Sequence, residues 1–315
     1  KLYLTFGGSL KLDGLYLEDT KGDTLVYSKS LLANVPLWAM IKGDAVGFDT
    51  LEWEGLRANI IRKDTIAGYN FQFLVDAFST SERTQPAKDT ISSAPINLVI
   101  GSASFKDFHI IFDDEVLGIN STYKIGDLDA EMNEVNLAEM VFSADDISIS
   151  NSDIKFIQTI DEVTPLPLFS ANSISLNRVK GYYESQPENL IADLKINSFY
   201  TEIPEINLSE KIFKLNTIQL KKSSISIRTK DSESKQNPIS KGSSSSTSIW
   251  PDAQLEVDAI LIDETQFLYS LNNAKASRNK FNANAIALEN IRLKVSDIYL
   301  KNKLGGIHLQ EFTFN

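Results

Sequence analysis

Apolar and polar residues alternate along much of the chain. Isoleucine or leucine takes every second position, and mostly short polar residues lie between, in Ile147 to Ile149, Ile174 to Leu176, Ile218 to Leu220, Ile225 to Ile227 and Ile298 to Leu300. Successive side chains of a strand point to opposite faces, so this alternation is typical of strands with one apolar and one solvated face. Helical periodicity is scarce. We therefore predict an all-β chain with single helical turns between strands.

The strand pattern also repeats along the chain. Residues 105 to 156 align without a gap on 176 to 227, a shift of 71 positions. Within the segment 134 to 156, the residues identical to their partners are Glu134, Asn136, Leu137, Glu139, Phe142, Ile147, Ser152 and Ile154. Self-similarity of this kind indicates a stack of equivalent units, so we predict an elongated, open sheet built from repeats, a solenoid-like groove.

Two weaker copies extend the repeat. A shift of 80 places Ile206, Leu208, Ile218 and Leu220 on Ile286, Leu288, Ile298 and Leu300. A shift of 100 places Val35, Leu37 and Met40 on Val135, Leu137 and Met140. The predicted segments are therefore an N-terminal unit 1–78, a linker 79–90, an acidic repeat unit 91–162, a repeat unit 163–230, a Ser-rich flexible loop 231–248 and a repeat unit 249–315. The linker and the loop are polar and contain proline, so they cannot bury enough apolar area to offset the entropy of ordering.

Short apolar turn elements recur between the predicted strands. They read PLWAMI at 36–41, LAEMVF at 137–142 and LSEKIF at 208–213. Their bulky residues could cap one end of the sheet. A helix that dips into a membrane is the other interpretation, but about six residues are too few for one alone, and core packing is favoured.

Charge and composition exclude several functions. The chain has 31 basic and 42 acidic residues, a net charge of −11, and 14 of the acids lie between 101 and 162. This balance argues against a nucleic-acid binder that collects phosphates on a basic face. There is no cysteine and there are only two histidines, His109 and His308. Thiol catalysis, disulfides and cysteine zinc sites are therefore excluded, and most histidine chemistry is disfavoured.

Candidate chemistry is sparse. The sequence has no GxSxG, no phosphate-binding glycine loop and no HExxH. Acidic clusters such as Asp113 to Glu115 do not match the EF-hand spacing and are better explained by turns, so we predict no metal site. His109 is expected to face outward from a strand. Composition leaves open a hydrolase with two carboxylates, yet no pair stands out. We predict a protein that is not an enzyme and has no cofactor.

The first eighty residues resemble a known family. The segments LTFGGSLKLDGLYLEDTKGDTLVYSKSL, NVPLWAMIKGDAVGFDTLEWEGLRANIIRKD and YNFQFLVDAF carry the match, including the Gly22 to Leu25 run, Arg62 after a strand pair, and Asn70-Phe71. They are similar to the N-terminal part of the TamB family (translocation and assembly module subunit) of the AsmA-like superfamily. The repeats downstream are similar to the middle region of that family.

The resemblance implies a fold, a location and partners. It implies an open, taco-like β-sheet whose concave apolar face conducts phospholipids between the inner and outer membranes of a Gram-negative bacterium. It further implies a periplasmic protein whose parent chain has an N-terminal membrane anchor, and an outer-membrane partner of the BamA family, similar to TamA. A link to outer-membrane protein assembly and secretion follows from the same resemblance.

The repeated apolar stripe is the candidate lipid-binding surface. It consists of Val135, Leu137, Ile147, Ile149, Ile206, Leu208, Ile218, Leu220, Ile286, Leu288, Ile298 and Leu300. A groove for acyl chains needs such a continuous stripe, whereas a closed core needs interlocked side chains at crystal-like density. Two alternatives stay open: a structural or adhesive β-solenoid with a filled, dry core, and a carbohydrate-active β-helix with clustered carboxylates.

A last motif concerns modification. The sequence Asp-Thr followed by an apolar residue is similar to an O-glycosylation sequon of some Gram-negative lineages. It places candidate acceptor hydroxyls at Thr24, Thr50, Thr65 and Thr90. Chance matches are expected at these residue frequencies.

Overall fold

The computed structural model describes residues 1–5, 9–34, 47–74, 99–136, 141–160, 168–231, 253–277, 280–301 and 304–315. Most of these residues lie in fifteen β-strands, and their helical part is the single turn 72–74. The all-β prediction is confirmed. Within these ranges, no helix has the length and apolar character needed to cross a membrane. Residues 36–41, 79–90, 137–140 and 232–248 lie outside the described residues, as do Val35 and Thr90.

The chain divides into two compact units, Lys1–Val163 and Thr164–Asn315. This division lies one residue from the predicted boundary between segments 91–162 and 163–230. We call them unit 1 and unit 2 and describe each by itself.

The strands of unit 1 follow one another through its sheet in chain order from β1 to β6. They are β1 (Leu2–Leu4), β2 (Ser9–Glu18), β3 (Thr24–Asn34), β4 (Gly47–Arg62), β5 (Val99–Asp114), β6 (Ile119–Asn136), β7 (Val141–Ser150) and β8 (Asp153–Gln158). Strands β4 and β5 are parallel, and the other pairs are antiparallel. The shorter β7 and β8 pair with the two halves of β6.

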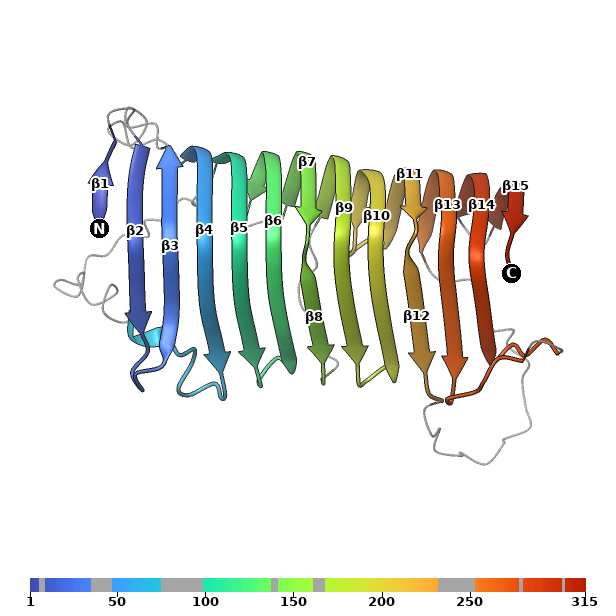
Figure 1. The fold of residues 1–315 in the computed structure, drawn as a ribbon, viewed down its shortest axis with the longest axis horizontal. Coiled ribbons are helices and arrows are strands. Elements are labelled where there is room, and N and C mark those ends of the chain that lie inside the picture. The colour runs from blue at the N-terminus through green and yellow to red at the C-terminus, as the bar shows by residue number, and fades with distance from the viewer. Residues whose placement is uncertain are drawn as a thin grey trace, which may run out of the picture. The chain divides into compact units, whose positions relative to one another are not determined.

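Unit 2 is built in the same way. Its strands are β9 (Leu168–Ser185), β10 (Leu190–Asn207), β11 (Ile212–Lys221), β12 (Ser224–Thr229), β13 (Gln254–Leu271), β14 (Ala285–Lys301) and β15 (Leu304–Thr313). The shorter β11 and β12 pair with the two halves of β10 and run parallel to β13. Figure 1 shows how the long strands within each unit run side by side and bend over.

The shift of 71 positions is visible in the strand bounds. Strands β6, β7 and β8 recur as β10, β11 and β12 at that spacing, residue for residue. The predicted alignment of Ile206 to Leu220 with Ile286 to Leu300, at a shift of 80, is wrong. Ile206 to Leu220 span β10, a turn and β11, whereas their four partners all lie in the uninterrupted strand β14. Strand β13 instead corresponds to β9 at a shift of 86.

The turn element LSEKIF is not helical. Residues 208–211 form a turn, and Ile212 and Phe213 already belong to β11. The helical turn expected at this position is therefore wrong. The apolar residues of this element extend a strand instead of forming a cap.

In each unit the sheet bends along a crease, a row of facing residues of which several have positive φ. In unit 1 the crease runs through Gly14, Lys29, Gly55, Asp107, Gly126 and Asn151, as the flanking strand pairs place them. Gly14, Gly55, Asp107 and Asn151 have positive φ. Such residues interrupt the strict alternation of a strand and bend it, as a bulge does.

Unit 2 has the equivalent crease, which contains Arg178 and Lys222 at 71 positions from Asp107 and Asn151. A serine fixes the bend in both units. The Gly126 amide donates to the Ser152 hydroxyl at 3.1 Å, and the Asn197 amide donates to Ser223 at the same distance. The conserved spacing of these contacts explains the identity of the two serines in the repeat.

The bend gathers a core on one side of the sheet in unit 1. Leu56, Ala58, Phe108 and Ile125 are buried together there. Trp53 lies before the crease and Phe108 after it, yet their ring centroids are 5.6 Å apart. Side chains from the two halves of the bent sheet therefore meet on this face, which is the concave one.

Candidate functional site

One face of each sheet is apolar from strand to strand. The strand register of unit 1 aligns two rows on the face that contains Trp53, namely Leu12, Leu31, Trp53, Phe105, Leu128 and Ile149, and Leu17, Val26, Ala58, Ile110, Tyr123 and Ile154. We call this face and its equivalent in unit 2 the inner face. Each row crosses six strands and contains no charged side chain.

The inner face of unit 2 has equivalent rows. They include Leu176, Phe199, Leu220, Ile262, Leu293 and Phe312, and Tyr183, Ala192, Ile227, Tyr269 and Ile286. Phe105, Leu128 and Ile149 of unit 1 correspond to Leu176, Phe199 and Leu220 here. The apolar rows are thus a property of the repeat.

The opposite, outer face is largely polar. A representative row of unit 1 is Lys11, Leu32, Glu52, Ser104, Asp129 and Ser148, and one of unit 2 is Ser175, Tyr200, Gln219, Leu261, Lys294 and Glu311. Water can solvate these side chains. The two faces therefore differ in chemistry as the alternation predicts.

Some residues of the inner face are buried, and others are partly exposed. Leu56 and Phe108 beside the crease are buried, whereas Ile149, Ile218 and Leu300 are partly exposed. No second layer of described secondary structure covers these residues, since every described strand is itself part of the sheet. An apolar surface of this extent without a cover is uncommon in a soluble protein and marks an interaction site.

Ten of the twelve predicted stripe residues lie on the inner face. They are Val135, Ile147 and Ile149 in unit 1 and Ile206, Ile218, Leu220, Ile286, Leu288, Ile298 and Leu300 in unit 2. Leu208 lies in the turn before β11, and Leu137 is outside the described residues. Leu220 is only 6% exposed, so it belongs to the closed part near the crease.

A buried ion pair closes the end of β4 and β5. Asp114 has no exposed surface, and Arg62, directly opposite it, donates Nε to both carboxylate oxygens at 2.9 Å. The Tyr69 hydroxyl donates to the same carboxylate at 2.7 Å, and the amides of Val116 and Leu117 complete its hydrogen bonds. Asp114, one of the acids interpreted as a turn residue, is therefore structural.

The surroundings keep Asp114 ionised. Burial opposes its charge, but the hydrogen bonds from Arg62, the Leu117 amide and Tyr69 outweigh this effect and hold the pKa of the carboxyl below its usual value. Asn70 accepts from the Ile61 amide at 3.1 Å and donates to the Asn59 carbonyl at 2.9 Å, which fixes the chain after β4.

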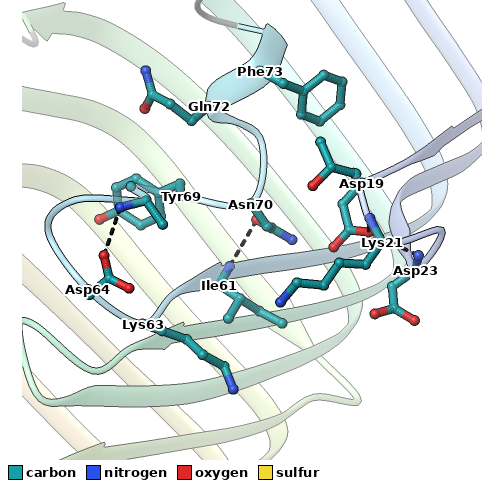
Figure 2. Close-up of a pocket in the computed structure, with 13 residues that line it drawn as sticks. Asp19, Lys21, Asp23, Ile61, Lys63, Asp64, Tyr69, Asn70, Gln72 and Phe73 are labelled. Atoms are coloured by element: carbon teal, nitrogen blue, oxygen red, sulfur yellow. Dashed lines mark hydrogen bonds between the residues drawn. The ribbon is translucent and has the colours of Figure 1, made fainter.

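A cavity of about 520 Å³ lies between that segment and the turn after β2 (Figure 2). Its lining includes Asp19, Lys21, Asp64, Asn70 and Phe73. Asp19 accepts from two backbone amides of its own turn, and Asp64 does the same. These carboxylates stabilise the turns that form the two sides of the cavity.

The described residues contain no group of three or more acidic or histidine side chains arranged to hold a metal ion. His109 lies opposite Lys124 on the outer face of β5, as predicted.

The candidate acceptor threonines differ in accessibility. Thr65 is exposed in the turn after β4, next to Ile66, which is 97% exposed. Thr24 and Thr50 lie in β3 and β4 and are partly buried. Thr65 is the most accessible acceptor among the described candidates.

The crease is the feature that sequence reasoning missed. Its signal was present as apolar residues three positions apart inside otherwise alternating strands, as in Trp53 to Leu56, Phe105 to Phe108 and Leu176 to Val179. A step of three keeps both residues on one face only if the strand is interrupted between them.

Comparison with known proteins adds no assignment. A scan against protein-family models finds no match to this chain, and a search of curated proteins finds none either.

Proposed function

We propose that the protein binds phospholipid acyl chains along the inner face and conducts them between two membranes, without enzymatic activity. The observation that carries this proposal is the partly exposed apolar face, whose rows cross five or six strands in each unit and which no second layer of the described residues covers. At roughly 25 cal/mol per Å² of apolar surface, covering such a face with acyl chains is strongly favourable.

A row structure suits transfer better than a single pocket. Equivalent apolar side chains follow one another from strand to strand, so a chain that leaves one row meets a similar row next to it. Movement along the sheet then needs no large change in binding free energy. The polar outer face keeps the protein solvated during this movement.

The resemblance to the TamB family supplies the cellular setting of the proposal. In that setting the protein lies in the periplasm of a Gram-negative bacterium, with a parent chain anchored in the inner membrane. Its partner is an outer-membrane protein of the BamA family, and lipid supply supports outer-membrane protein assembly or translocation.

The second candidate is a structural β-solenoid with a filled, dry interior. The closed cluster of Leu56, Ala58, Phe108 and Ile125 at the crease favours it locally. In that case the partly exposed rows farther from the crease serve adhesion or packing and hold no lipid.

Lipid extraction followed by mass spectrometry tests the proposal against this alternative. Protein purified from a bacterial host without detergent should contain phospholipid, whereas a dry solenoid should contain none. The variant Leu300→Asp places a charge on the partly exposed inner face, where it can reach water but interrupts the apolar path. It should remain folded and lose lipid, while Lys301→Asp on the outer face should keep it. Leu220 is unsuitable for this substitution because a buried carboxylate there would unfold the protein.

A further inference from the structure

A single polar atom without a partner interrupts the inner face of unit 2. Thr201 is 2% exposed, and its hydroxyl has no hydrogen-bond partner. Among the described residues, it is the one buried side-chain nitrogen or oxygen that has no hydrogen-bond partner. The other buried hydroxyls nearby differ, since Ser223 accepts from Asn197 and Thr265 donates to the Asp263 carbonyl at 3.1 Å.

The surroundings of Thr201 are aliphatic. The register places it in a row with Ile174 and Ile218, and the row continues through Ile260 to Val295. Ile174, Ile218 and Ile260 are partly exposed, so a chain lying along this row would pass directly beside Thr201. The equivalent residue of unit 1 is Ala130, which has no hydroxyl, so the fold itself does not require one here.

A buried hydroxyl without a partner carries a penalty that native proteins usually avoid. Rotation about the Cα–Cβ bond moves the hydroxyl among three staggered positions, one of which is the position that the methyl group otherwise takes. Thr201 is covered by its neighbours, so its hydroxyl reaches a ligand on the inner face when that ligand displaces the adjacent, partly exposed isoleucine side chains.

We infer that Thr201 donates a hydrogen bond to the ester carbonyl of a glycerolipid bound on the inner face of unit 2. This inference rests on the proposed function and specifies the chemistry of the ligand. An ester carbonyl accepts a hydrogen bond, carries no charge and lies at the start of long apolar chains. A hydrocarbon lacks the acceptor, and the ionised carboxylate of a free fatty acid would have to be desolvated among aliphatic side chains.

Two lipids separate this contact from general apolar binding. The probes are a diacyl phosphatidylethanolamine and its dialkyl ether analogue, which share headgroup and chain length but differ in the carbonyl. The protein is incubated with vesicles that contain equal amounts of both, and the lipid that it retains is quantified by mass spectrometry. One neutral hydrogen bond corresponds to a preference of about fivefold for the diacyl lipid.

Substitutions assign the preference to one hydroxyl. Thr201→Val should retain both lipids equally, while Thr265→Val, which removes a hydroxyl that already has a protein partner, should keep the preference. Equal retention by the unmodified protein, or a preference that survives in Thr201→Val, overturns the inference. Retention of neither lipid contradicts the proposed function as well.

Thermal unfolding provides a second, independent result. Because the hydroxyl has no protein partner, Thr201→Val should unfold at the same temperature as the unmodified lipid-free protein, or at a higher one. A lower unfolding temperature would show that the hydroxyl stabilises the fold, and this result would overturn its assignment to a ligand.

Discussion

Replacing Asp114 with asparagine should destabilise unit 1 strongly. The carboxylate is fully buried, and Arg62 opposite it is only 19% exposed on its side chain. Removing one partner of a buried pair leaves the other charge without compensation, which costs about 3–5 kcal/mol. Asparagine has nearly the same shape, so the loss measures the charge and its hydrogen bonds and includes little cavity formation.

Asp107→Asn is the matched control. Asp107 also pairs with an arginine, Arg57, at 2.7 Å, but the side chains are 70% and 40% exposed. Water screens such a pair, and its removal should cost no more than about 1 kcal/mol. Urea unfolding, followed by the fluorescence of Trp53 and the other tryptophans, gives both free energies. Equal losses for the two variants would refute the role assigned to the buried pair.

The same group gives a prediction about pH. The pKa of Asp114 is lower in the folded protein than in the unfolded chain, so its contribution to stability is complete above the unfolded value of about 3.9. It is lost as the pH falls through the lower, folded value. The acid unfolding of Asp114→Asn should therefore depend less on pH below about pH 4.

Two further predictions concern the crease and the exposed turn. Gly55→Ala should destabilise the protein more than Gly14→Ala in urea unfolding. Both residues have positive φ, so an alanine is strained at either position. The added Cβ at Gly55 also lies 2.7 Å from Lys29 Cβ, whereas Gly14 faces open space. We expect about 1 kcal/mol for Gly14→Ala from backbone strain alone, and the crease assignment fails if the two variants are equally stable. If the sequon is used in the native host, intact mass should show a sugar that Thr65→Ala removes, and an unmodified mass for the native protein would exclude it.

The alternation of apolar residues was enough to predict the strands. Ile149 and Leu220 occupy equivalent places in their rows because strand periodicity and the repeat agree. The third copy was misaligned for a physical reason. Isoleucine and leucine alternate in the same way in two strands joined by a turn and in one uninterrupted strand such as β14. Sequence similarity alone therefore could not fix the register.

Features that depend on distant residues could not be predicted. Arg62 and Asp114 are 52 positions apart in the sequence, and only the parallel pairing of β4 and β5 brings them together. The crease escaped notice because Asp107, Arg178 and Glu264 adopt positive φ without being glycine. Whether the Thr201 hydroxyl has a hydrogen-bond partner likewise depends on residues that are distant in the sequence.

Site-specific photo-crosslinking in cells tests the central claim most directly. Photo-reactive residues at Ile149, Ile218 and Leu300, which are partly exposed on the inner face, should capture phospholipid. The adjacent outer-face positions Ser148, Gln219 and Lys301 should not, because neighbouring residues of a strand point to opposite faces. Capture at both kinds of position, or at neither, would contradict an inner face that conducts lipid.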